Sequence, residues 1–350
     1  MSPPQLVVLR QTGLGDLLTA LPALRAVRRH FPTHWIRTTC PSWLLPLATR
    51  LNVADDFIVE DRASADPTDH ERADGSMLRK ALCRSETPDV VVALRVPEPG
   101  LLQELLRQRP RILVAYGHPE VDATADFPEF SFSDHILVRW ERLLDWHCIP
   151  TRRTDLHVAL WPDGAQTDGA HTVVHVGAGS PARCWPALRW GEVARSLTSY
   201  GHRVVLTGSA GEAAVVARVC RDAGLSTERN VFARTDAVAL AELVAGARLV
   251  LSCDTGIAHL AVALRRRSVT LFGGVPPAWW GPPPGCALHR TLWKGRFGEP
   301  YGAEPALGLL EISAGEVLDA ALNPEWPDAT NRAYCCPYLA GDDVSSETDW

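Results

Sequence analysis

Short apolar runs alternate along the first half of the chain with segments whose apolar residues recur at helical spacing. The runs predict strands at residues 6–9, 35–39, 89–94 and 111–115. The helical spacing predicts helices at residues 17–31, 42–50, 101–106 and 134–147, with Ser42 as an N-cap. The run at 89–94 is apolar throughout, which is typical of a parallel strand covered on both faces. Strands that alternate with helices predict βαβ units and a parallel sheet.

The second half of the chain repeats this alternation. Its strands are expected at residues 172–175, 203–207, 249–252 and 268–272, and its helices at 187–199, 256–264, 313–322 and in a segment ending near 223. A capping box, Ser313 to Glu316, opens the last helix, and residues 273–300 are expected to form a loop. We therefore predict an α/β protein with domains over 1–155 and 165–322, a hinge near residue 160, and an irregular tail over 323–350.

The composition narrows the class of protein. At 350 residues the chain has room for about two domains. A net charge of -6 argues against nucleic acid as the main partner, because phosphate binding needs a basic surface. The nine cysteines are scattered without a C-x-x-C pair, which favours reduced thiols in the cytoplasm. No run predicts a transmembrane helix, and the first residues lack the pattern of a secretory signal.

The first glycine-containing loop, Gly13-Leu-Gly15-Asp16, lies between a predicted strand and a predicted helix. It does not match a dinucleotide fingerprint, because Leu18 stands where a third Gly or Ala belongs. Asp16 has two interpretations. It is either a helix N-cap or a general base that takes a proton from a substrate hydroxyl.

The second loop, residues 177–186, has the residue types of an anion site. Gly177 and Gly179 allow close approach of the backbone to a phosphate, and Ser180 adds a hydroxyl. Arg183 presents a planar set of N–H donors that suits phosphate oxygens. The alternative is an ordinary turn with an exposed arginine.

The third and fourth loops also follow predicted strands. In Thr207-Gly208-Ser-Ala-Gly-Glu212 the acid either caps the helix or accepts hydrogen bonds from a ribose diol. In the fourth loop, Thr255 and Gly256 can donate N–H groups to a phosphate at a helix N-terminus. Asp254 would normally cap that helix, and His259 is either a core residue or a ligand-binding one.

Metal chemistry has little support in the sequence. No D-x-D pair or H-E-x-x-H motif is present, and neither of the two H-x-x-x-H spacings, at 30–34 and 171–175, lies within a predicted helix. We therefore expect neither a metal nor another cofactor, and a departing diphosphate would be neutralised by Arg183 and helix N-termini. Trp279 and Trp280, in the loop after residue 273, could stack on a base or a sugar.

Taken together, the four loops resemble glycosyltransferase family 9, the ADP-heptose:lipopolysaccharide heptosyltransferase-like enzymes. The resemblance is carried by residues 8–16 with 21–25, 175–180 with Arg183 and Trp185-Pro186, 206–212, and 254–259 with 271–273. Four blocks in this order are specific, whereas one would be weak. This chain departs from the family at Val176 and Gly274, where members often have proline.

The resemblance implies a GT-B fold, in which two Rossmann-like domains with parallel sheets face each other across a cleft. It also implies an inverting, metal-independent transfer. Asp16 would be the base, in an acceptor loop with Thr12, Gly13 and Gly15. The residues implied at the donor phosphates are Arg183, Ser180, Gly179, Thr255 and Gly256. Those implied around the nucleoside and donor pocket are Thr207, Gly208, Glu212, Asp254 and His259.

The implied partners are a nucleotide-sugar donor and a glycan or glycolipid acceptor. An ADP-linked heptose is the expected donor, and residues 60–76 and 116–133 are the expected acceptor surface. A monomer in the cytoplasm, peripheral to the inner face of the membrane, would suit a role in lipopolysaccharide biosynthesis. Two alternatives remain open: an NAD(P)-dependent two-domain dehydrogenase, and a non-catalytic relative that binds a nucleotide-sugar.

Overall fold

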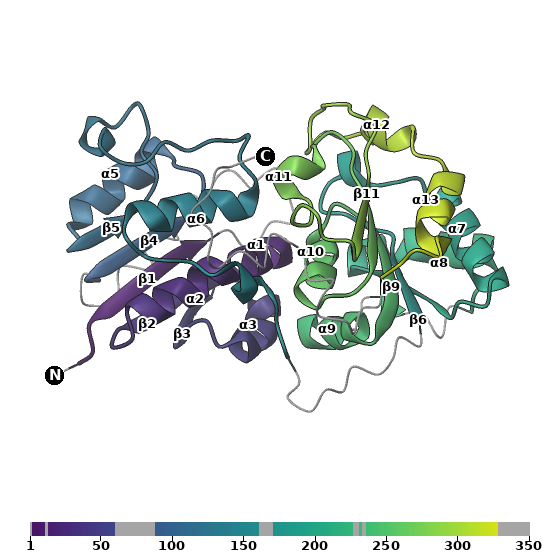
Figure 1. The fold of residues 1–350 in the computed structure, drawn as a ribbon, viewed down its shortest axis with the longest axis horizontal. Coiled ribbons are helices and arrows are strands. Elements are labelled where there is room, and N and C mark those ends of the chain that lie inside the picture. The colour runs from purple at the N-terminus through teal and green to yellow at the C-terminus, as the bar shows by residue number, and fades with distance from the viewer. Residues whose placement is uncertain are drawn as a thin grey trace.

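The computed structural model describes residues 2–10, 13–59, 88–160, 171–226, 231–232 and 236–327. These residues form two parallel β-sheets, each flanked by helices (Figure 1). The first sheet has five strands in the order β3-β2-β1-β4-β5, and the second has six in the order β11-β10-β9-β6-β7-β8. The predicted α/β class with parallel sheets is therefore confirmed.

The first sheet is built around its most apolar strand. Its strands are β1 (Gln5–Arg10), β2 (Trp35–Cys40), β3 (Asp56–Val59), β4 (Val90–Leu94) and β5 (Ile112–Val114). Successive side chains of β1 enter different cores, because strand side chains alternate between the faces of a sheet. Leu6 and Val8 join a large cluster, whereas Val7 and Leu9 pack in a smaller one with residues of α5 (Pro99–Gln108). The alternation of strands and helices did not predict β3, which is half exposed.

The helix predicted over residues 17–31 is wrong in one respect, because the structure has two helices there. The first is α1 (Leu14–Thr19) and the second is α2 (Leu21–His30). Pro22 lies in the first turn of α2, where its missing N–H and its ring cannot continue the preceding helix. The first half also contains α3 (Leu45–Leu51) and α6 (Ile136–Trp146). Ser42 does not cap α3, because it starts a short 3-10 turn that follows Pro41.

The second sheet carries the other three predicted loops, which follow β6, β7 and β9. Its strands are β6 (His171–His175), β7 (Val204–Gly208), β8 (Val231–Phe232), β9 (Ala247–Cys253), β10 (Ser268–Leu271) and β11 (His289–Leu292). Its helices are α7 (Ala187–Ser199), α8 (Ala213–Ala223), α9 (Ala237–Ala245), α10 (Gly256–Ala263), α11 (Pro277–Trp280), α12 (Leu307–Leu310) and α13 (Ala314–Leu322). The predicted capping box is confirmed, since the Ser313 hydroxyl accepts from the Glu316 N–H at 3.2 Å.

The prediction of a loop over residues 273–300 is wrong, because this segment holds α11 and the edge strand β11. The β11 sequence, His-Arg-Thr-Leu, has no apolar run, since the strand is partly exposed at the edge of the sheet. The sequence pattern also did not predict α9, α12 or β8.

The two halves of the molecule meet through an apolar contact between helices. Helix α1 packs on α10, and α3 packs on α9, so the two halves share one cluster of buried side chains (Figure 1). Residues before the predicted hinge join this contact, because the Val158 N–H donates to the Ala263 carbonyl at 3.0 Å. The domain boundary at 155–165 stays a prediction, since residues 161–170 lie outside the described chain. None of the described helices is long and apolar enough to cross a lipid bilayer.

Candidate functional site

Asp16 lies in the first turn of α1, at the end of β1. Gly13 is the N-cap of this helix, and the Gly13 N–H donates to Asp16 Oδ2 at 3.1 Å. The N-cap interpretation of Asp16 is therefore corrected, because this carboxylate occupies the third helical position and accepts a hydrogen bond from the N–H of the N-cap residue. Its side chain remains 23% exposed, so one face of the carboxylate is open to a substrate. Thr12, the first residue implied in the acceptor loop, lies outside the described residues.

Arg10 is a functional candidate that the sequence analysis did not single out. Its side chain is 3% exposed and forms an ion pair with Asp16 Oδ1 at 3.1 Å. The guanidinium also donates to the Asp16 and Leu94 carbonyls, and it lies 4.7 Å from the centre of the Trp140 ring. These contacts hold the Asp16 side chain in one orientation. The signal in the sequence was a charged residue directly after an apolar strand.

The N-termini of α1 and α10 approach each other closely across the two halves. A Cβ on Gly15 would lie 2.8 Å from His259 Cδ2, and a Cβ on Gly256 would lie 2.8 Å from Leu14 Cβ. Only glycine fits at either position without a shift of its neighbour. The first and fourth predicted loops therefore meet, although about 240 residues separate them in the sequence.

This contact supports a prediction about stability. We expect Gly256→Ala to lower the free energy of unfolding by about 1–3 kcal/mol, because overpacking a close contact costs this much. Gly100→Ala is the matched control, since Gly100 also lies in the first turn of a helix and a Cβ there meets nothing within 4 Å. Urea unfolding measures both variants. Equal stability of the two would show that the two helix ends are not packed in this way.

His259 lies in α10 at this junction, with its ring next to Gly15. Burial, followed by the nearby His135 and Arg183, lowers the pKa of His259 to about 4. The imidazole is therefore neutral at neutral pH. It can exchange hydrogen bonds with a ligand without adding a charge there.

Arg183 lies in the loop after β6 and reaches the end of β9. Its Nη1 donates to the Asp254 carbonyl at 3.2 Å, and its guanidinium lies 5.8 Å from the centre of the Tyr301 ring. Among the described residues, the buried Nε of Arg183 has no hydrogen-bond partner. A Cβ on Gly179 would lie 3.1 Å from Arg183 Nη2. The arginine therefore has a donor available for a ligand oxygen.

Asp254 and Thr255 lie between Arg183 and the start of α10. Burial raises the pKa of Asp254 to about 6, although the nearby Arg183 opposes this shift. Thr255 is the N-cap of α10, and its buried Oγ1 has no partner among the described residues. Its side chain makes no capping bond. This hydroxyl and the first N–H groups of α10 suit an anion, since the N-terminus of a helix attracts negative charge.

The Ser180 side chain forms two hydrogen bonds within the protein. The buried hydroxyl accepts from the Ala182 N–H at 3.3 Å and lies 3.5 Å from the Gly302 carbonyl, to which it donates. Its assignment to the donor phosphates stays a prediction. Any contact it makes with a phosphate would have to compete with these bonds.

Glu212 lies where the third loop meets the second. Its Oε2 accepts from the Ser209 N–H at 2.6 Å, which makes it the acid of a capping box. A Cβ on Gly177 would overlap the Glu212 carboxyl group, at 1.9 Å from its Cδ. A Cβ on Gly208 would lie 3.2 Å from Glu212 Oε2. Both glycines therefore make room for this carboxylate.

His175 and Thr207 complete this part of the site at the ends of β6 and β7. His175 Nδ1 and Thr207 Oγ1 are 3.0 Å apart. Burial lowers the pKa of His175, and the Glu212 carboxylate opposes that shift. A hydrogen-bonded polar pair thus lies near the Glu212 carboxylate, at the ends of two neighbouring strands.

Helix α6 connects the two halves through two side chains that the sequence did not indicate, His135 and Arg139. His135 caps α6 with Nδ1, so its Nε2–H donates to the Gly281 carbonyl at 3.1 Å. The Arg139 guanidinium lies 5.4 Å from the centre of the Trp280 ring. Burial lowers the pKa of Arg139 to about 10. Trp280 therefore contacts the first half of the protein, so the stacking of this side chain on a ligand stays a prediction.

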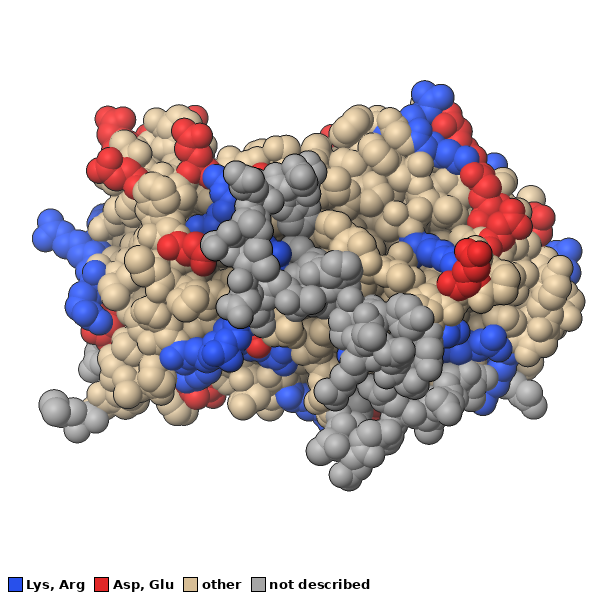
Figure 2. Space-filling view, viewed as in Figure 1, with Lys and Arg blue, Asp and Glu red and all other residues tan. Residues whose placement is uncertain are grey.

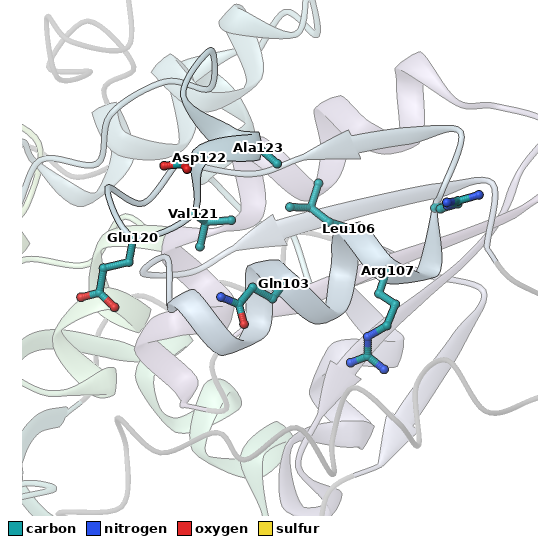
Figure 3. A pocket seen from close by; sticks show the side chains of 8 residues that line it. Gln103, Leu106, Arg107, Glu120, Val121, Asp122 and Ala123 are labelled. Carbon is teal, nitrogen blue, oxygen red and sulfur yellow. The ribbon is translucent and has the colours of Figure 1, made fainter.

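The expected acceptor surface is described only in part. Residues 60–76 lie within the undescribed segment 60–87, whereas 116–133 form an ordered turn with Gly117 N–H donating to the Pro128 carbonyl at 2.9 Å. A surface pocket lies between this turn and α5 (Figure 3). Its lining residues are Gln103, Leu106, Arg107, Arg109, Glu120, Val121, Asp122 and Ala123. Residues 120–123 of this lining belong to the expected acceptor surface, but none of the residues implied for the base, the donor phosphates or the nucleoside lines the pocket.

In the described part of the face shown in Figure 2, basic and acidic side chains are interspersed. Within the ranges that the structure describes, no three His, Cys, Asp or Glu side chains form a group that could hold a metal ion.

Comparison with known proteins identifies the family model of glycosyltransferase family 9 (heptosyltransferase), which matches residues 159–288. Lipopolysaccharide heptosyltransferase 2 of Escherichia coli K12 is 33% identical over 107 residues, which is 29% of this chain and 30% of that protein. Lipopolysaccharide heptosyltransferase 1 of Pseudomonas aeruginosa is 37% identical over 98 residues, which is 28% of this chain and 27% of that protein. Each of these matches thus spans less than a third of the relative's length.

Solved structures extend the likeness to the whole fold. ADP-heptose lipopolysaccharide heptosyltransferase II of E. coli aligns with a TM-score of 0.64 at 20% identity, over 91% of this chain and 97% of that chain. A family 9 glycosyl transferase from Veillonella parvula aligns with a TM-score of 0.70 at 19% identity, over 92% of this chain and 98% of that chain. The expected GT-B fold is confirmed. This chain is therefore a glycosyltransferase family 9-like protein, by sequence over residues 159–288 and by fold over about nine-tenths of its length.

Proposed function

We propose that the chain transfers a sugar from a nucleoside-diphosphate donor to a hydroxyl group of a glycan or glycolipid acceptor. One observation supports this function most strongly. The helix that carries Asp16 abuts the helix whose N-terminus follows Asp254 and Thr255, through the close approach of Gly15 to Gly256. A partly exposed carboxylate from one half therefore lies beside an anion-binding loop from the other.

The second half would hold the donor. Arg183, the Thr255 hydroxyl and the N–H groups at the start of α10 suit a diphosphate, because all are hydrogen-bond donors, and the Arg183 Nε and Thr255 Oγ1 have no partner among the described residues. Glu212, next to Gly177 and Thr207, would accept hydrogen bonds from the nucleoside hydroxyls. These assignments give individual residues of this chain the roles that the family resemblance implies.

The reaction would be a single displacement. Asp16 takes the proton of the acceptor hydroxyl, and the oxygen attacks the anomeric carbon from the face opposite the nucleotide. The bond from that carbon to the diphosphate oxygen breaks, so the configuration inverts. The departing diphosphate keeps the electron pair, and Arg183 and the α10 N-terminus stabilise its charge. Holding both substrates in place supplies about 7–11 kcal/mol of the barrier reduction.

Arg10 would act as a positioning residue in this step. Its ion pair and its bonds to two carbonyls keep the Asp16 carboxylate aimed in one direction. A fixed base is more effective than a mobile one, because less conformational freedom is lost when the acceptor binds.

The relatives support a substrate class for this chain. An E. coli heptosyltransferase with ADP has the same fold, with a TM-score of 0.59, and the sequence relatives are lipopolysaccharide heptosyltransferases. We therefore infer an ADP-linked heptose as donor and a heptose-deficient lipopolysaccharide core as acceptor. A cytoplasmic monomer would carry out the sugar transfer at the inner face of the membrane.

Thermal stabilisation by nucleotide-sugars tests this proposal. ADP-, GDP- and UDP-linked sugars are compared with and without EDTA, and an ADP-linked sugar at 100 times its Kd should stabilise the fold by about 2.7 kcal/mol. EDTA should change neither this stabilisation nor the rate of transfer, since the proposed site uses Arg183 and backbone N–H groups in place of a metal ion. No stabilisation by any of the three donors would refute the proposal, and loss of transfer in EDTA would refute its metal-independent form.

A further inference from the structure

Four aromatic side chains gather beside the loop that carries Arg183. We call Trp279, Trp293, Phe297 and Tyr301 the aromatic shelf. The Phe297 ring lies 5.8 Å from the Trp279 ring and 5.7 Å from the Trp293 ring, measured between centroids. Phe297 nevertheless remains 67% exposed. A large aromatic ring held between two tryptophans and still open to solvent is a candidate contact surface for a ligand.

Hydrogen bonds to backbone carbonyls hold the shelf at the ends of the strands. The Trp293 Nε1–H donates to the Gly273 carbonyl at 3.2 Å, just after β10. The Gly298 N–H donates to the Gly274 carbonyl at 2.9 Å, and a Cβ on Gly274 would lie 2.7 Å from the Gly298 carbonyl oxygen. The segment next to Phe297 is therefore held against the loop after β10 by direct backbone contact.

Backbone hydrogen bonds also connect the segment that carries Tyr301 to the Arg183 loop. The Ala182 N–H donates to the Gly302 carbonyl at 3.1 Å, and the Ala306 N–H donates to the Ala182 carbonyl at 3.0 Å. The Tyr301 ring lies under the Arg183 guanidinium. Arg183 and the shelf thus form one structural unit.

The strand order indicates which part of a ligand would reach the shelf. The strand ends follow one another as β7, β6, β9 and β10. Glu212 follows β7, and Arg183 bridges β6 to the end of β9. In the shelf, Trp279 follows β10, and the other three residues follow β11, the next strand at the edge of the sheet. A donor whose nucleoside lies near Glu212 and whose diphosphate lies near Arg183 would therefore direct its sugar end towards the shelf.

The neighbouring tryptophan places the shelf near the junction of the two halves. Trp279 contacts Phe297, whereas the next residue, Trp280, lies over Arg139 of the first half. Helix α11 thus has one tryptophan on the shelf and one on the other half of the protein. An acceptor sugar held between the halves would also come close to this surface.

We propose that the aromatic shelf, with Phe297 as its exposed ring, binds the apolar C–H face of a pyranose. This proposal rests on the proposed function, and the pyranose is either the sugar of the donor or the terminal sugar of the acceptor. Aromatic rings suit this ligand, because a sugar ring buries its C–H groups against the ring while its hydroxyls stay hydrated.

The test uses Phe297→Ala in the full chain, with Phe297→Tyr as the conservative variant. Tyr200→Ala is the matched control, since Tyr200 is a 69% exposed aromatic residue of the same half, at the end of α7. Calorimetry with ADP and with ADP-heptose measures the donor, and the KM for a heptose-deficient lipopolysaccharide core measures the acceptor. Wild-type affinity for ADP tests the proposed function separately.

We expect all variants to bind ADP within about twofold of wild type. If the shelf binds the donor sugar, Phe297→Ala weakens ADP-heptose binding about 5- to 10-fold, because one aromatic stacking contact is worth about 1–1.5 kcal/mol. If it binds the acceptor sugar, the acceptor KM rises by a similar factor and ADP-heptose affinity is unchanged. Phe297→Tyr should stay near wild type in both cases.

Two results would overturn the proposal. Unchanged ADP-heptose affinity together with unchanged acceptor KM in Phe297→Ala would remove the shelf from sugar binding and leave the proposed function intact. Failure of wild type to bind either ADP or ADP-heptose would refute the proposed function and this inference with it.

Discussion

Asp16→Asn should lower the rate of sugar transfer by about 10²–10⁴-fold, the usual contribution of a general base. Asparagine has nearly the same shape, and its side-chain oxygen can still accept from the Gly13 N–H, so the start of α1 should persist. Arg10 keeps its bonds to the Asp16 and Leu94 carbonyls, which do not depend on the carboxylate. Affinity for ADP should therefore be unchanged. Steady-state transfer assays and calorimetry measure the two quantities.

Asp55→Asn is the matched control for this prediction. The Asp55 carboxylate also accepts from a backbone N–H, that of Ile36 at 2.7 Å, and pairs with Arg28 at 2.6 Å. It is a partly exposed acid of the same half and lies at none of the implied site positions. A rate near wild type in Asp16→Asn, or an equal loss in both variants, would exclude Asp16 as the base.

Arg183→Ala should weaken nucleoside-diphosphate binding about 10- to 100-fold. Hydrogen bonds to a charged group contribute about 1.5–3 kcal/mol, and each 1.4 kcal/mol is a tenfold change in affinity. The side chain offers a buried Nε–H that has no partner among the described residues, so a phosphate oxygen would gain a donor that is already desolvated. Isothermal calorimetry with ADP measures the loss, and Arg183→Lys should recover part of it because the charge remains.

Arg195→Ala is the control for a general effect of losing an arginine. Arg195 belongs to the same half and, like Arg183, donates to a backbone carbonyl, that of Asp222, at 2.9 and 2.6 Å. Its loss should leave ADP affinity unchanged. Equal ADP affinity in Arg183→Ala and wild type would show that the second loop does not bind the donor phosphates.

Much of the fold followed from local patterns. The apolar run at 89–94 and the helix at 187–199 match β4 and α7 closely, because a covered strand and an amphipathic helix leave a clear signature. Strands and helices whose sequence pattern is short or polar were not predicted. The edge strand β11 lacks an apolar run, and the break between α1 and α2 depended on how Pro22 acts inside an otherwise regular apolar face.

The candidate site was predictable as a set of loops, but their contacts were not. Glycine loops that follow parallel strands must lie at one edge of a sheet, so residue types alone placed Gly179, Thr207 and Asp254 in a common region. Whether a side chain in those loops is open or already bonded depends on its neighbours. Ser180 proved to be a buried cap, whereas Arg183 has a free donor.

The sequence by itself determined the two α/β halves, the four loops at their strand ends and the resemblance to the family, because these depend on periodicity and on short motifs. Only the tertiary structure brought Gly15 against His259, paired the buried Arg10 with the partly exposed Asp16 carboxylate, and joined the segment next to Phe297 to the Arg183 loop. Each of these contacts depends on the direction of a side chain or on how elements far apart in the chain pack. Local sequence preferences do not encode either quantity.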